Sequence, residues 1–135
     1  MSYEEGKNSF TMNAATKNIL QYTFVQVSTA GKDYVKKGAL QASSSTRVFP
    51  VGVTQNAPVG TYEALEIAGP GSITKLVCSS TKLGYGSRII VGASGAAAST
   101  ASVTDKHPLV GVWLSAAAAV NSIGTALFWP YGIST

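Results

Sequence analysis

Charged side chains are scarce in this 135-residue sequence, because aspartate, glutamate, lysine and arginine together make up only 12% of it, about half the usual share. Hydrophobic residues make up 45%. A surface with so few charges is poorly suited to a protein that works as a solitary monomer. It suits a protein whose surface is largely covered by partner proteins. We therefore expect a surface of small uncharged residues that serves protein contacts.

The residues on which most enzymes and metal sites depend are also few. The chain has one cysteine, Cys78, and one histidine, His107, so it can form neither an internal disulfide nor a zinc cluster of cysteines. Glu63 and Glu66 are three apart on a predicted strand and therefore face opposite sides, which argues against a carboxylate pair. No nucleophile-elbow pattern is present to serve His107. The sequence predicts no catalytic residue, no cofactor and no metal site, with Cys78 as a packed side chain.

Long apolar runs and clustered cations are missing as well. No run approaches the ~20 residues of a membrane span, and residues 1–5 are acidic and lack the apolar core of a signal peptide. The net charge is +4, but the cations are scattered and only Lys36 and Lys37 are adjacent, whereas nucleic-acid binders usually cluster them. We expect a protein made in the cytoplasm and used there or in a particle assembled there, with no membrane and no nucleic acid as partner.

What the sequence does contain is a series of short β patterns. Residues 48–55 are the clearest, since Phe49, Val51 and Val53 alternate with less apolar residues. Further strands are predicted over residues 21–27, 34–35, 62–67, 73–78, 88–91, 109–114 and 125–129, the last closed by Pro130. The aromatic side chains predicted to lie in the core are Phe24, Phe49, Trp113 and Phe128.

The segments between these strands are turns and small-residue stretches. Residues 92–104 are almost wholly Gly, Ala, Ser, Thr and Val and are predicted to form a loop, and residues 115–120 have the propensity for one helical turn. From residue 48 onward turns recur about every 8–12 residues, without alternating long helices. This pattern predicts a mainly β fold: one small barrel or sandwich-like (β-tulip-like) domain with little helix.

The N-terminal residues 1–20 show no strong periodicity, so we assign them to an extended arm and residues 21–135 to the β-rich domain. The arm is either a frayed terminus or a segment that orders on a neighbouring subunit. Phe10 and Met12 are costly to leave in water, and at the other end Phe128 and Trp129 face opposite sides of one strand. The predicted protein-contact residues are Tyr3, Phe10, Met12, Trp129 and Tyr131. Deleting residues 1–12 is expected to weaken partner binding and leave the fold intact.

The order of motifs resembles that of the capsid cement (head decoration) proteins of tailed phages. Residues 51–58, VGVTQNAP, are similar to the family's "-GVxQNxP-" turn, and the Gly-rich residues 83–88 and 92–98 follow in its order. Residues 109–119, LVGVWLSAAAA, resemble its "-vvGvaleaaaa-" run. The resemblance extends over about residues 34–130, although Tyr85-Gly86-Ser87 stands where the family has an acid.

This resemblance implies a β-domain that forms homotrimers on the outside of an expanded capsid and clamps adjacent major capsid subunits, with no catalytic residue to carry over. The partners implied are the major capsid protein and further copies of the chain, and the implied location is the capsid exterior. Two alternatives stay open: a nucleic-acid-binding module on a small five-stranded barrel, and a minor tail or fibre protein of the virion. A small hydrolase lacks the necessary proton-handling residues.

Overall fold

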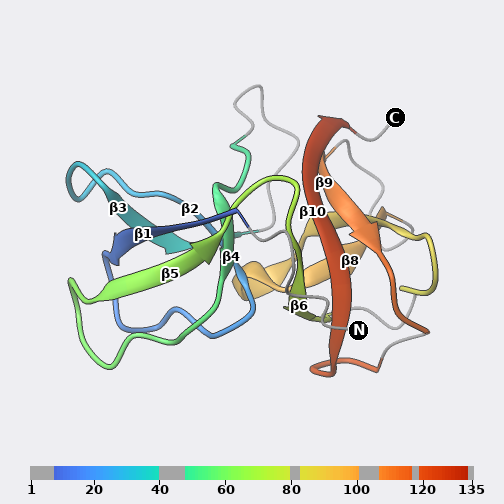
Figure 1. Ribbon diagram of the computed structural model, residues 1–135, viewed down its shortest axis with the longest axis horizontal. Helices are drawn as coiled ribbons and strands as arrows, with labels where there is room; N and C mark the ends of the chain where they lie inside the picture. Colours follow the sequence, from blue (N-terminus) through green and yellow to red (C-terminus); the bar gives the residue numbers. More distant parts are fainter. Residues whose placement is uncertain (1–7, 40–47, 80–82, 101–106, 117–118, 134–135) are drawn as a thin grey trace.

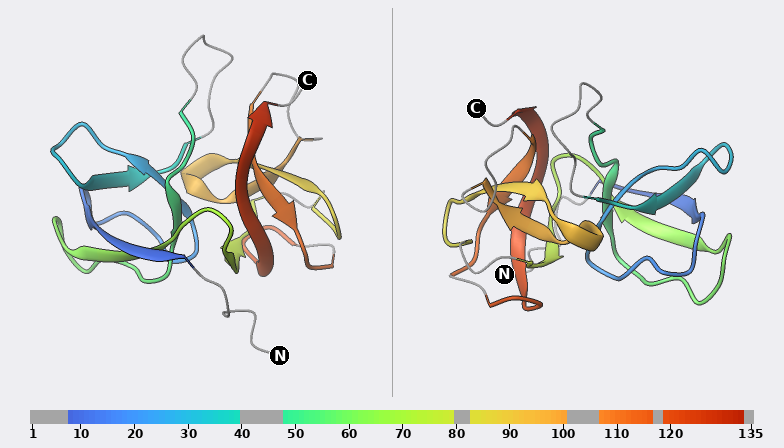
Figure 2. Two further views of the ribbon diagram at one scale, coloured as in Figure 1. Left: turned by 45° about the horizontal axis from the view of Figure 1, so that its top comes forward. Right: turned by 180° about the vertical axis from the view of Figure 1, so that it is seen from behind.

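The structure, a computed structural model, describes residues 8–39, 48–79, 83–100, 107–116 and 119–133. In these ranges the chain forms ten strands and almost no helix, which confirms the mainly β prediction. The strands make two lobes that lie side by side, a closed barrel and a five-stranded sheet (Figure 1). The rotated views in Figure 2 show the same two lobes.

The first lobe is a closed five-stranded barrel in the order β1-β3-β2-β4-β5. Its strands are β1 (Ser9–Ala14), β2 (Phe24–Val27), β3 (Tyr34–Lys37), β4 (Gly52–Thr54) and β5 (Ala64–Ala68). β1 closes the barrel because it pairs with β5 in antiparallel and with β3 in parallel. The inner side chains are apolar: Ala14, Ile19, Val25, Val35, Leu65 and Ile67. On β5, Leu65 and Ile67 are buried while Glu66 is exposed, as the alternation of its sequence predicts.

The second lobe is a sheet in the order β6-β10-β9-β7-β8, antiparallel throughout. Its strands are β6 (Ile73–Val77), β7 (Arg88–Val91), β8 (Ala97–Ser99), β9 (Pro108–Trp113) and β10 (Ile123–Ile133). The two edges approach each other, since Cys78 forms a parallel bridge with Ala97 and the Ser79 N–H donates to the Ala97 carbonyl at 2.8 Å. The sheet is therefore strongly curled, with one face enclosed and one face outward.

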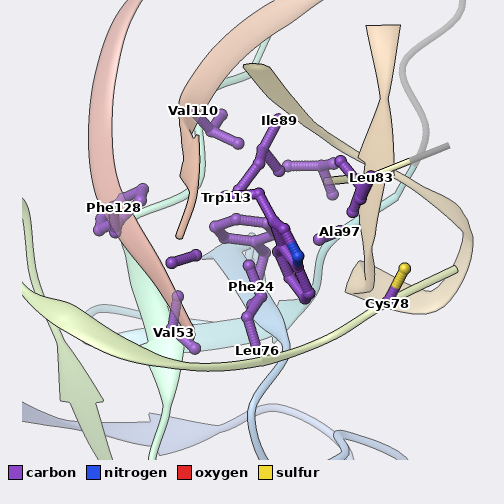
Figure 3. Close-up of a cluster of buried hydrophobic side chains, with 12 residues drawn as sticks. Phe24, Val53, Leu76, Cys78, Leu83, Ile89, Ala97, Val110, Trp113 and Phe128 are labelled. Atoms are coloured by element: carbon purple, nitrogen blue, oxygen red, sulfur yellow. The ribbon is translucent and has the colours of Figure 1, made fainter. Parts of the chain in front are cut away.

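A shared core joins the two lobes into one domain. Phe24 and Val53 belong to barrel strands, yet they pack in the same cluster as Trp113 and Phe128 of the curled sheet. Figure 3 shows Phe24 and Trp113 at the centre of this cluster. The rings of Phe24 and Phe128 are tilted by 55° at a centroid distance of 5.8 Å. Because β2 directs Phe24 to the sheet and Val25 into the barrel, one strand contributes to both cores.

The assignment of residues 1–20 to an arm needs correction over its described part. Ser9–Ala14 is β1, and five of its residues pair with β5. Phe10 and Met12 are half-buried against the barrel core. Their apolar side chains are therefore removed from water within the domain itself, without a neighbouring subunit. Deleting residues 1–12 would remove most of a barrel strand, so we now expect this deletion to disturb the barrel rather than to leave the fold intact. Residues 1–7 lie outside the described ranges.

Four smaller predictions also differ from the structure. Residues 92–104 are not simply a loop, because Ala93–Gly95 is a short 3-10 turn and Ala97–Ser99 is the buried strand β8. Phe49 is 39% exposed and lies before β4. β10 continues through Pro130, with a register shift between Phe128 and Gly132 that accommodates the missing N–H. No helix occurs in the described part of residues 115–120.

Candidate docking face

The residues that most often ligate metals are dispersed in the described part of the chain. No group of three or more His, Cys, Asp or Glu is placed to hold a metal ion in these ranges. His107 is buried just before β9, and Cys78 is buried in the shared core. In the same residues, no helix has the length and apolar character that a membrane crossing requires. The candidate site described below is a contact surface.

The burial of Cys78 leads to a prediction about its reactivity. Because the thiol is enclosed in the core, a thiol reagent reaches it only when the fold opens. We expect labelling by Ellman's reagent to be at least on the order of 100-fold slower in native buffer than in denaturant. Absorbance at 412 nm measures both rates. Native labelling as fast as that of the unfolded chain would contradict the burial of Cys78.

The five predicted contact residues do not form one site. Phe10 and Met12 lie on β1 in the barrel, whereas Trp129 and Tyr131 lie on β10 in the sheet. Tyr3 lies outside the described residues. Trp129 and Tyr131 are 54% and 44% exposed. The contact role of all five stays a prediction, and the exposed pair indicates where to look for a surface.

The outward face of the curled sheet carries a continuous set of apolar side chains. Along β10 the side chains alternate, with Ala126 and Phe128 buried and Leu127 and Trp129 directed outward. Residues directly opposite each other on two paired strands point to the same face of a sheet. The pairing register therefore shows which residues of the neighbouring strands lie on the outward face beside Leu127 and Trp129. The row through Leu127 runs over four strands: Ile73, Leu127, Val112 and Arg88.

Two further rows lie beside the first. Ile123 is opposite Val77, and Thr125 is opposite Lys75. The Leu114 N–H donates to the Thr125 carbonyl at 2.8 Å, which continues that row past the end of β9. We call the surface formed by these three rows and Trp129 the outer sheet face. Ile123 and Leu114 are 56% and 40% exposed.

The charges on the outer sheet face are of one sign. Its cations are Lys75 and Arg88, and both side chains are exposed. The Lys75 ammonium lies 5.7 Å from the centroid of the Tyr22 ring at the boundary with the barrel. The described carboxylates, Asp33, Glu63 and Glu66, all lie on or beside barrel strands. The face is thus apolar and cationic, with no acid among its described residues.

Sequence reasoning found Trp129 but missed most of this face. Ile123 follows a turn and Leu114 is the last residue of an apolar run, and neither stands out in the sequence as a surface residue. These residues are brought together by the pairing register of β6, β10 and β9. The pattern of residue types along the sequence does not reveal this register.

The adjacent lysines occupy a different place. Lys36 and Lys37, with Thr16, Asn18, Gln26 and Ala39, border an open hollow of about 270 Å³ on the barrel. None of these lining residues is aromatic, so the hollow lacks the stacking platform that single-stranded nucleic acids use. The arrangement does not favour the nucleic-acid alternative.

Comparisons with known proteins give a likeness at the level of structure. No protein-family model matches the chain, and no curated protein matches its sequence. Its fold is similar to the crystal structure of the N base of the head fiber protein gp8.5 of bacteriophage phi29, with a TM-score of 0.61 and 17% sequence identity. The alignment covers 92% of this chain and 97% of the phi29 chain. At this identity the likeness establishes a shared fold over nearly the whole length of both chains.

Proposed function

We propose that this protein is a non-enzymatic structural component of a phage head, which binds the outside of the expanded capsid as a homotrimer and stabilises the shell. The observation that carries the proposal is the fold, which is similar over 92% of the chain to the base of a phage head fiber. The outer sheet face supports it, because an apolar surface without reactive groups is built for docking.

The stabilisation follows from linkage. A protein that binds the assembled, expanded shell and not its dissociated subunits shifts the equilibrium toward the shell by mass action. A trimer placed on a symmetric lattice makes three contacts at once, so weak contacts of each protomer add up to tight binding. Small uncharged surface residues reduce the desolvation cost of each contact.

Co-sedimentation with shells tests this function. We expect the purified protein to pellet with expanded shells of the phage that encodes it and to stay in the supernatant with unexpanded shells. Native mass spectrometry of the free protein is expected to give three times the chain mass of 13.9 kDa. A monomer that ignores both kinds of shell would refute the proposal.

A second candidate, the base of a head fibre, is favoured by the similarity of the fold to the N base of the phi29 head fiber protein. A fibre base also binds the shell but additionally holds a projecting partner. Electron microscopy of particles with and without the protein separates the two roles. Loss of projections together with the protein would favour the fibre base, and loss of shell strength alone would favour the cement role.

Salt dependence separates shell binding from the nucleic-acid alternative. With two cations on an otherwise apolar face, we expect shell affinity to fall by less than about 10-fold between 50 and 200 mM NaCl. A protein bound through 6–10 phosphate contacts loses on the order of 1,000-fold or more over this interval. Sedimentation at several salt concentrations, with oligonucleotide binding as the parallel measurement, distinguishes the two. A steep loss with tight oligonucleotide binding would contradict shell docking.

A further inference from the structure

We infer that the outer sheet face is the surface by which this chain docks on a partner protein that presents apolar side chains bordered by carboxylates. The inference rests on the proposed function, under which that partner is the capsid shell. It assigns the contact to β6, β10, β9 and the start of β7, and it makes Lys75 and Arg88 the residues that fix the charge preference of the contact.

The apolar content of the face is at the upper end of what a monomer exposes to water. Ile123, Trp129 and Leu114 are each between 40% and 56% exposed, and Ile73, Val77, Val112 and Leu127 are half-buried around them. Together they leave an exposed apolar patch of the order of several hundred Å², as large as the largest patch on most monomers, and such patches often mark binding sites. Since a standard interface buries about 800 Å² on each partner, the face supplies most of one docking contact.

The charges on the face determine which partner fits. Lys75 and Arg88 form no ion pair with any described residue, and the face has no described acid. Complementary potentials across an interface give specificity, so the matching surface must carry carboxylates.

A second copy of the chain fits this face poorly. In a twofold pairing of the face with itself, Lys75 and Arg88 would meet the same cations of the other copy without a neutralising acid. The described carboxylates lie on the barrel, but there they are interspersed with Lys17, Lys32, Lys36 and Lys37. The described residues of the barrel therefore offer no acidic surface to complement the face.

A second exposed apolar group lies at the far end of the barrel and serves as a comparison. The Tyr34 and Tyr62 rings meet edge to face at 5.3 Å, and Val59 is the most exposed large apolar side chain of the described residues. Asp33 and Glu63 lie beside these rings in the sequence, so this tip carries acids where the sheet face has none. A change at the tip should not affect a contact made by the sheet.

Charge reversal and apolar truncation on the face test the inference. The double variant K75E/R88E and the single variants Trp129→Ala and Ile123→Ser are compared with K32E/K36E and Tyr62→Ala on the barrel. We expect each face variant to lower the affinity for expanded shells by roughly 10-fold or more, and the barrel variants to bind as the wild type does. The charge-conserving double variant K75R/R88K should retain binding. Circular dichroism and thermal melting establish that each variant is folded.

The outcomes are distinguishable. If the wild type does not pellet with shells, both the proposed function and this inference fail. If the wild type binds and the face variants bind equally well, the inference is overturned while the function stands. If the face variants instead lower the native mass of the free protein, the face joins copies of the chain, and the assignment to the shell is overturned. Shell binding that is lost only in the face variants, at unchanged native mass, supports it.

Discussion

Replacing Trp113 by alanine is expected to lower the free energy of unfolding by about 4 kcal/mol and the melting temperature by about 10 °C or more. Trp113 is fully buried and is the largest buried side chain of the described chain. It lies in the cluster that joins the barrel to the sheet, and its indole N–H donates to the Ala116 carbonyl at 3.2 Å. The substitution leaves a cavity between the two lobes, which a rigid sheet cannot close.

Trp129 provides the matched control for this prediction. It is the other tryptophan of the chain, but it stands on the outer sheet face and is half-exposed. We expect Trp129→Ala to cost less than about 1 kcal/mol of stability. Urea unfolding followed by far-ultraviolet circular dichroism measures both variants, since removing tryptophan alters the fluorescence signal itself. Equal losses for the two variants would contradict the assignment of Trp113 to the core and Trp129 to the surface.

The strands were largely predictable because their sequences carry local signals. Leu65, Glu66 and Ile67 alternate, and Ile89 to Val91 is a β-branched run, so both segments were placed from residue type alone. β1 was missed because its alternation is weak: its six residues, SFTMNA, include only two large apolar side chains. β8 was missed because alanines and a serine carry no β signal, and their place in the fold comes from close packing against β7.

The docking face was only partly predictable, for a different reason. Trp129 was recognised because Phe128 and Trp129 are neighbours on one strand and one of them had to face outward. That the neighbours of Trp129 are apolar and cationic depends on which strands flank β10. The order β6-β10-β9-β7 combines segments up to about 50 residues apart in the chain, and long-range pairing of this kind leaves no local trace.

Gly111→Ala is expected to destabilise the protein by about 3 kcal/mol or more, although it adds a single methyl group. Gly111 lies in β9 opposite Phe128, and a Cβ at this position would overlap the Leu127 carbonyl oxygen of β10. The obstructing atom belongs to the backbone of a neighbouring strand, so no side-chain rotation relieves the overlap and the strands must separate. The row of Leu127 and Val112 on the outer sheet face depends on this same pairing.

Gly84→Ala is the control because a Cβ there meets no atom within 4 Å, and its φ is not in the left-handed region. We expect its stability to stay within about 0.5 kcal/mol of the wild type. Chemical denaturation compares the stability of the two variants. Co-sedimentation of Gly111→Ala with shells, below its melting temperature, measures whether the outer sheet face still binds. If Gly111→Ala were as stable as Gly84→Ala, strands β9 and β10 could not be as close as the structure places them. The outer sheet face would then lose its geometric basis, because its rows are defined by that register.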